Sequence, residues 1–218
     1  MALGFRGIKL KTGADVNAEI RRAKTLRAHV GPDITIMVDG NYIFDEYKAP
    51  YFTNAVGDLG ILWFEEPIQP ENRNGYLRLA QRSPVALAAG ESEFTAHDLI
   101  DLLAAGAIQY AQPDVTRCGG ISESLRVAMV ADAFHVKYAP HVGFSGAICV
   151  AASLHLSAVS PNLSCMECRV TPSAFREELV RTPVGLYTQV KDGCLAIPEG
   201  PGLGVEVDWK RVDRYLDR

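Results

Sequence analysis

The sequence lacks both a strong charge excess and a long apolar run. It holds 22 lysine and arginine residues against 26 aspartate and glutamate residues, which leaves a net charge of −4. Because the numbers of basic and acidic residues are nearly equal, the protein has no broad positive surface. We therefore expect no binding to nucleic acid or to an anionic membrane. The most apolar segment, residues 145–159, is interrupted by His155 and is too short to span a bilayer. No signal-peptide pattern opens the chain, so we expect a cytoplasmic protein whose partner is a small molecule.

Cysteine is also scarce, with 5 residues in a chain of 218. An odd number in a chain of this length argues against a disulfide framework, and most of these cysteines lie in apolar stretches, which favours a reduced, cytosolic protein. Cys165 and Cys168 form one C-x-x-C pair, but residues three apart on a strand point to opposite faces. Because no second cysteine or histidine pair completes a zinc site, we interpret the pair as structural.

The sequence does contain a regular alternation of short β-rich runs and amphipathic helical stretches. The runs are nearly all apolar, as expected for parallel strands that are buried on both faces. They cover residues 7–11, 34–39, 61–65, 85–89, 108–112, 136–140 and 163–167. Helical spacing of apolar residues is clear over 16–26 and 121–129, and helix starts are indicated at Thr95 and Ser145.

This alternation predicts an α/β fold with a parallel sheet. The repeat is nearly constant and polar residues follow every strand, which favours a TIM-type (β/α) barrel over an open sheet with one switch point. We expect a single domain over residues 1–218, with barrel units to about residue 178. Residues 179–218 are predicted to form a hairpin around Asp192-Gly193 and a tail.

One ionisable residue stands at the carboxyl end of each predicted strand. Successive members are separated by 23 to 28 residues, and a parallel barrel brings such positions to one rim, where barrel enzymes carry out their chemistry. They are Lys11, Asp39, Glu65, Glu91, Asp114, His141 and Glu167. A charge after one strand is common in loops, but a series in register predicts an active site.

The three central acids, Asp39, Glu65 and Glu91, follow consecutive strands and should lie side by side. Three adjacent carboxylates repel one another and raise each other's pKa, and a divalent cation relieves that repulsion. Oxygen ligands of this kind suit Mg²⁺. The alternative is that each acid caps the helix after it, but for the three together we favour a Mg²⁺ site.

Lys9 and Lys11 are two residues apart on the first predicted strand, so both point to the same face. At the end of a buried strand that face is the barrel interior, where a lysine is costly unless it has a function. Near a divalent cation an ammonium group loses its proton more readily and can act as a general base. The alternative is that both side chains extend into solvent.

On the opposite flank, Asp114 and His141 end neighbouring strands, where a carboxylate can hold the imidazole tautomer and raise its basicity. We interpret them as an acid/base dyad. Glu167 follows on the next strand and could hydrogen-bond a substrate carboxylate if it is protonated, orient the dyad, or pair with Arg169. A base, a cation and a second acid/base on the opposite face are what abstraction of a proton alpha to a carboxylate requires, because the charge of the enediolate must be neutralised as it forms.

These residues lie in motifs that resemble the enolase superfamily, and within it the mandelate racemase subgroup. The matching motifs span almost the whole chain and are Gly7-Ile-Lys-Leu-Lys11, Val38-Asp-Gly-Asn41, Trp63-Phe-Glu-Glu-Pro67, Ala89-Gly-Glu91, Gln112-Pro-Asp-Val115, Ala139-Pro-His-Val142 and Met166-Glu167.

The resemblance implies a role for each matched residue. Mg²⁺ would be held by Asp39, Glu65 and Glu91, with Glu66 outside the ligand set. Lys11 would be one base and Lys9 would assist at the substrate carboxylate. The second acid/base would be His141, activated by Asp114, and Asn41 would contact the substrate.

Members of this subgroup include acid-sugar dehydratases, racemases and cycloisomerases. The tail over residues 198–204 looks like the sugar-acid members, so the resemblance implies a sugar-acid dehydratase. Racemisation, epimerisation or cycloisomerisation of a hydroxy or sugar acid is the alternative.

Members of the family normally also have an N-terminal capping domain and a strand ahead of the lysine strand, and neither is found in this sequence. A second alternative is therefore an inactive, truncated metal-binding barrel that needs a partner chain. Because unpaired strand edges favour association, we expect a homo-oligomer.

Overall fold

The computed structural model describes residues 3–216, apart from the side chain of Phe175, and places six strands in one parallel sheet in sequence order. The strands are β1 (Gly7–Lys11), β2 (Thr35–Asp39), β3 (Ile61–Glu65), β4 (Leu87–Ala89), β5 (Tyr110–Ala111) and β6 (Lys137–Tyr138). The helices are α1 (Val16–Val30), α2 (Lys48–Val56), α3 (Arg73–Ala80), α4 (Ala96–Ala104), α5 (Ile121–Ala133), α6 (Ala147–Val159), α7 (Ala174–Glu177) and α8 (Trp209–Val212), with 3-10 turns η1 (Gly57–Leu59) and η2 (Tyr187–Gln189). The predicted α/β class is confirmed.

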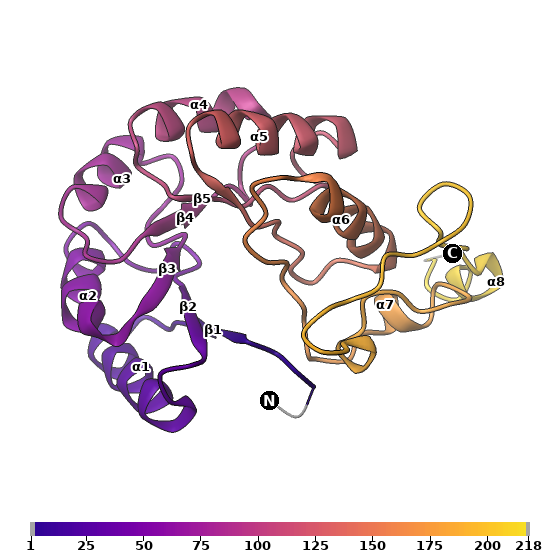
Figure 1. Cartoon of the computed structure of the whole chain (residues 1–218), viewed down its shortest axis with the longest axis horizontal. Helices are drawn as coiled ribbons and strands as arrows, with labels where there is room; N and C mark the ends of the chain where they lie inside the picture. The colour runs from indigo at the N-terminus through magenta and orange to yellow at the C-terminus, as the bar shows by residue number, and fades with distance from the viewer. Residues whose placement is uncertain (1–2, 217–218) are drawn as a thin grey trace.

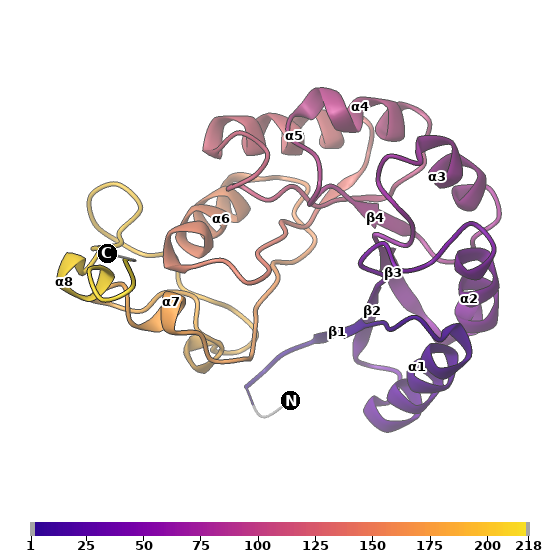
Figure 2. The same cartoon turned by 180° about the vertical axis from the view of Figure 1, so that it is seen from behind.

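Each strand pairs in parallel with the next one in sequence. The strands form the inner wall of an arc, and α1 to α5 form its outer rim (Figures 1 and 2). Lys11 pairs with Asp39, and Asp39 pairs with Glu65, so the carboxyl ends of the first three strands lie level. This register brings the strand-end side chains to one rim.

The main hydrophobic core lies between the sheet and the outer helices. Ile36 and Val38 of β2 are fully buried, and the rings of Phe44, Phe52 and Phe64 lie 5.0 to 5.8 Å apart between centroids. Strands that are buried on both faces need apolar side chains toward both the helices and the barrel interior.

The predicted helices form where apolar residues repeat at helical spacing. The N-terminus of α1 is capped by the Asp15 carboxylate, and the helix buries Ile20 and Ala23 against the sheet. The run predicted to begin at Ser145 becomes α6, which begins at Ala147 because Ser145 belongs to the preceding turn. Among residues 3–216, no helix combines the length and apolarity that crossing a membrane requires.

The predicted seventh strand, residues 163–167, is reduced to a single bridge between Tyr138 and Leu163. The Tyr138 N–H donates to the Asn162 carbonyl over 2.9 Å, and the Ser164 N–H donates to the Tyr138 carbonyl over 2.8 Å. Beyond Ser164 the segment has no strand on its other side in the described chain, and the arc is open between it and β1 (Figures 1 and 2). A segment paired at one edge keeps few ladder bonds, which explains its irregular backbone.

The segment after residue 178 contains the predicted turn without the strands of a hairpin. Lys191 and Cys194 exchange two backbone N–H···O bonds of 2.9 Å around Asp192 and Gly193. Both central residues have positive φ, 52° and 78°, as a type I′ turn requires. The residues before the turn form η2 rather than a strand, so the turn stands alone.

Candidate active site

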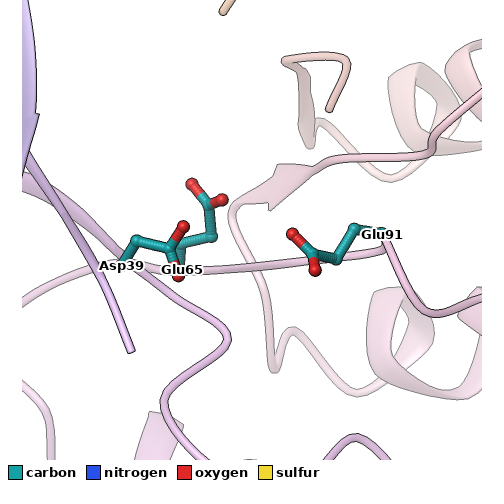
Figure 3. Close-up of side chains that lie close together, drawn as sticks. All are labelled: Asp39, Glu65 and Glu91. Carbon is teal, nitrogen blue, oxygen red and sulfur yellow. The ribbon is translucent and has the colours of Figure 1, made fainter. Parts of the chain in front are cut away.

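The three strand-end acids meet inside the arc. Asp39 ends β2, Glu65 ends β3, and Glu91 follows β4 by two residues. One carboxylate oxygen from each lies within 4.8 Å of the other two, and all three residues are buried. Glu91 reaches toward Asp39 and Glu65 from the next strand end (Figure 3). The structure therefore brings together the acids that the strand spacing predicted.

Lys9 and Lys11 lie on the same face of β1, and both contact these acids. Lys9 Nζ is 2.6 Å from Glu65 Oε1 and 3.5 Å from Asp39 Oδ2, and Lys11 forms an ion pair with Asp39. Burial alone would lower the pKa of Lys9, but the carboxylates around it, Glu65 above all, outweigh burial and raise that pKa. Lys9 is therefore enclosed among the acids, whereas Lys11 is bound to Asp39 but keeps 48% of its side chain exposed.

The same contacts shift the pKa values of Asp39 and Glu65 in opposite directions. Burial opposes ionisation of Asp39, but the ammonium groups of Lys9 and Lys11 outweigh it and lower the pKa of Asp39. Burial raises the pKa of Glu65, and although Lys9 lowers it, the adjacent Asp39 carboxylate raises it again. The pKa values of Lys9, Asp39 and Glu65 thus depend on one another.

The donor set suits a hard divalent cation. Carboxylate oxygens are the ligands that Mg²⁺ prefers, and Glu91 Oε2 is buried without a hydrogen-bond donor in the described part of the chain. His141 Nε2 lies 3.1 Å from this oxygen but without hydrogen-bond geometry. An unsatisfied buried oxygen is costly, and a cation between Asp39, Glu65 and Glu91 would satisfy it. The residues therefore fit Mg²⁺.

Three side chains for which the sequence predicted no role complete the hydrogen bonding of these acids. Trp63 Nε1 and Gln112 Nε2 donate to Glu65 Oε2 over 3.1 and 2.8 Å. Tyr42 Oη donates to Glu91 Oε1 over 2.5 Å. Trp63 could have been found, because residues two apart on a strand share a face. Nothing in the sequence marks Tyr42, whose φ of 61° is rare for a bulky residue.

Asp114 and His141, which the sequence predicted as neighbours, lie in hydrogen-bond contact. Asp114 Oδ2 lies 2.8 Å from His141 Nδ1. Burial lowers the pKa of His141, but the hydrogen bond with Asp114 and the carboxylates of Glu91 and Glu167 outweigh it and raise that pKa. Because β1 and β6 are the two outer strands of the sheet, Lys11 and His141 approach the acids from opposite sides.

Glu167 contacts both Lys9 and the turn that follows His141. Its Oε1 is 3.0 Å from Lys9 Nζ, and its Oε2 accepts the N–H groups of Val142 and Gly143 over 3.0 and 2.9 Å. Burial raises the pKa of Glu167, but Lys9 and these backbone donors outweigh it and lower the pKa to about 2. An ionised carboxylate favours orientation of the dyad over hydrogen bonding by a protonated acid. Among the described residues Arg169 makes no ion pair with it, and stacks instead 3.6 Å from an aromatic ring centroid.

The structure separates Glu66 from its neighbour Glu65. Glu66 is buried away from the cluster and accepts the Tyr76 hydroxyl over 2.7 Å and the Gly90 N–H over 3.0 Å. Burial raises its pKa to about 8, with smaller contributions from the nearby acids, against the effect of these two donors. Its contact with the residue before Glu91 ties β3 to β4 behind the cluster.

Asn41 and the cysteine pair lie outside these contacts. The Asn41 backbone N–H donates to Asp39 Oδ1 over 2.9 Å, but its exposed side chain makes no hydrogen bond to a described residue. Cys165 and Cys168 are free thiols.

Comparison with known proteins gives consistent relatives. The family model described as "Enolase C-terminal domain-like" matches residues 1–211. The D-galactarolactone cycloisomerase of Agrobacterium fabrum is 33% identical over 95% of this chain and 56% of its own length. The arabinonate dehydratase of Saccharolobus solfataricus is 31% identical over 94% of this chain and 54% of its own.

A solved structure of an enolase from Bradyrhizobium, complexed with magnesium and mandelic acid, superimposes with a TM-score of 0.84. It is 31% identical over 97% of this chain and 55% of that one. This chain therefore spans about half the length of the curated relatives it matches. The matched family model covers nearly the whole chain, so the chain belongs to the enolase superfamily, within its C-terminal domain-like family.

Proposed function

We propose that this protein removes the proton alpha to the carboxylate of a sugar acid with the help of Mg²⁺, and that the overall reaction is a dehydration. The observation that carries the proposal is the placement of three buried carboxylates between two lysines and a histidine–aspartate dyad. The relative named as an arabinonate dehydratase supports the choice of reaction.

The acidic cluster and Lys9 would bind and neutralise the substrate carboxylate. Asp39, Glu65 and Glu91 would hold Mg²⁺, which when bound supplies positive charge to the carboxylate as the α carbon loses its proton. Lys9 already lies within 3.0 Å of Glu65 and Glu167, so its ammonium is placed to pair with a further carboxylate. Substrate binding and charge neutralisation would thus occur at one point.

Lys11 and His141 would move the protons. In the dehydration one base removes the α proton, and the imidazolium of His141 gives a proton to the β hydroxyl, so that the C–O bond breaks and water leaves. Asp114 holds Nδ1, which leaves Nε2 as the atom that exchanges protons. Asn41 would contact the substrate at the rim, and Glu167 would orient the histidine side of the site.

A cycloisomerase or a racemase is the second candidate. The observation that favours it is the 33% identity to a D-galactarolactone cycloisomerase. In a racemase Lys11 and His141 would act in turn on the two faces of one carbon, and their positions on opposite sides of the acids permit this. The products distinguish the reactions, because only dehydration releases water.

The test is proton exchange in deuterated water. The protein is incubated with Mg²⁺ and a panel of sugar acids, and the α-proton signal and any new keto product are followed by NMR. We expect exchange or product for at least one acid, and loss of both when a chelator is added.

Two variants give this test its controls. Glu91→Gln should weaken Mg²⁺ binding measured by calorimetry by about 100-fold or more. Glu46→Gln should leave it unchanged, because Glu46 pairs with Arg78 on the surface. Intact Mg²⁺ binding without exchange of any acid would contradict the enzyme and favour the metal-binding barrel that needs a partner chain.

We further propose a cytoplasmic homo-oligomer. The five cysteines are free thiols, which supports a reducing compartment. The outer edge of β1 has no partner strand among the described residues, and free edges favour association. Light scattering after size-exclusion chromatography should give a mass of two or more chains, and a monomer would contradict this.

A further inference from the structure

The turn after His141 packs directly against the imidazole. Gly143 has a φ of 49°, in the left-handed region that favours glycine. A β-carbon at this position would lie 2.6 Å from His141 Cε1 and 2.8 Å from Nε2. The backbone of Gly143 therefore covers the ring edge that carries the free nitrogen, and any shift of the turn changes where that nitrogen points.

Two charged side chains, the partly buried Glu167 and the buried Arg176, hold this turn from opposite sides of Gly143. Its N–H donates to Glu167 over 2.9 Å, and its carbonyl accepts from Arg176 Nη2 over 3.3 Å. Arg176 also donates to the Ser145 carbonyl from Nη2 over 3.0 Å and from Nε over 3.3 Å. Both peptide groups around Gly143 are thus held by charged side chains.

Arg176 is an unusual residue to find in this place. It is 2% exposed and has no carboxylate within ion-pair distance among residues 3–216. Burial lowers the pKa of its guanidinium, and its carbonyl partners lie at the N-terminal end of α6, where the helix dipole disfavours a cation. A buried, uncompensated cation is costly for folding, so stability alone does not explain it.

We propose that Arg176 is a positioning residue for His141, which it holds through the carbonyls of Gly143 and Ser145. The inference rests on the proposed function, because it assigns His141 the role of acid/base. In this arrangement Asp114 fixes the ring at Nδ1, and the turn held by Arg176 and Glu167 fixes the edge at Cε1 and Nε2. The segment after Glu167 thereby contributes to the site without touching substrate.

The test follows the imidazole directly in the protein without substrate. The Cε1–H resonance of His141 is identified as the signal that His141→Asn removes. In Arg176→Ala we expect this signal to move or broaden, and added guanidinium to restore it. With a substrate that exchanges, kcat of the histidine-dependent step should fall about 10-fold or more while KM and Mg²⁺ affinity change little.

Arg211→Ala is the matched control, because Arg211 binds Asp208 and the Glu178 carbonyl in the same C-terminal part of the chain. This variant should leave the Cε1–H signal of His141 unchanged.

If Arg176→Ala does not fold, Arg176→Lys decides, since it should move the signal with Asp114 intact. An unchanged signal in folded variants, or equal losses of kcat and Mg²⁺ affinity, would overturn the proposal. The NMR test needs no turnover of any acid. The role of Arg176 and the proposed reaction can therefore be contradicted separately.

Discussion

The two sides of the candidate site are built in different ways. On the acidic side, Asp39 and Glu65 end strands of five residues that pair in parallel from β1 to β3, with one register shift between Ile36 and Val38. On the histidine side the pairing is sparse. His141 follows a strand of two residues and keeps one bridge to Asp114, Glu167 follows a single bridge, and the Glu167 carboxylate binds the backbone N–H groups after His141. The proposed cation ligands thus depend mainly on the sheet, whereas the proposed acid/base depends more on a few charged side chains.

This difference predicts that the two sides can be disturbed separately. A ladder of parallel strands resists the loss of one side chain, because each strand is held by bonds along its length. The turn after His141 is held by one glutamate and one arginine, so the loss of either side chain should move it. Variants on the histidine side should therefore change proton transfer before they change Mg²⁺ binding.

The largest effect is expected for His141→Asn. Loss of a general acid/base costs on the order of 10²- to 10⁴-fold in rate, so dehydration should fall by about 10³-fold. Exchange that uses Lys11 alone can survive, and Mg²⁺ affinity should be unchanged because His141 is not a ligand. Product formation and calorimetric titration are measured on the same preparation. Loss of Mg²⁺ binding in this variant would break the separation between the two sides.

The next effect concerns Glu167, whose folded pKa of about 2 lies below the ordinary value of 4.5. A carboxyl whose pKa is lowered by folding stabilises the protein above its unfolded pKa, and this contribution disappears as the pH falls through the folded value. We expect about 3 kcal/mol of stability at neutral pH to be lost between roughly pH 5 and pH 2.

Urea unfolding of wild type and Glu167→Gln at several pH values checks this expectation. The difference in free energy of unfolding between the two proteins should shrink as the pH falls through that window. A difference that stays constant down to pH 3 would show that Glu167 is not held as an ionised group on the histidine side.

The smallest effect is expected for Tyr42→Phe on the acidic side. Tyr42 Oη donates to Glu91 Oε1 and also lies 2.8 Å from Ser92 Oγ, so its loss frees one oxygen of a proposed ligand. Loss of a side chain that orients a ligand costs about 10- to 100-fold in metal affinity, and we expect the lower value here because Glu91 keeps its place after β4. Tyr51→Phe, at an exposed tyrosine bonded to Asn17, is the control. Equal Mg²⁺ affinity in wild type and Tyr42→Phe would contradict the role given to Tyr42.

The positions of the lysines and acids on the acidic side could be predicted from the sequence. Apolar runs at a constant repeat placed the strands, and a parallel register put Lys11, Asp39 and Glu65 at level positions. The alternation of side chains along a strand put Lys9 and Lys11 on one face. The repeat of strands and the alternation of side chains along each strand are regular, so residue spacing alone predicts where these side chains lie.

The histidine side could be predicted only in outline. The pairing of Asp114 with His141 followed from neighbouring strand ends, but the short strands and the irregular segment after Ser164 did not. Arg176 lies 35 positions beyond His141 in the sequence, and no periodicity links a residue on a short helix to the turn it holds. On the acidic side, Tyr42 was missed because a left-handed backbone at a tyrosine has no sequence signature.

The most direct test of this account is the face of the substrate on which each base acts. Deuterium incorporation at the α carbon is followed for both epimers of an accepted acid with Mg²⁺, in wild type, Lys11→Met and His141→Asn. The account predicts reciprocal losses, in which each variant fails to exchange one epimer and still exchanges the other. Loss of the same epimer in both variants would contradict the placement of the two bases on opposite sides of the three acids.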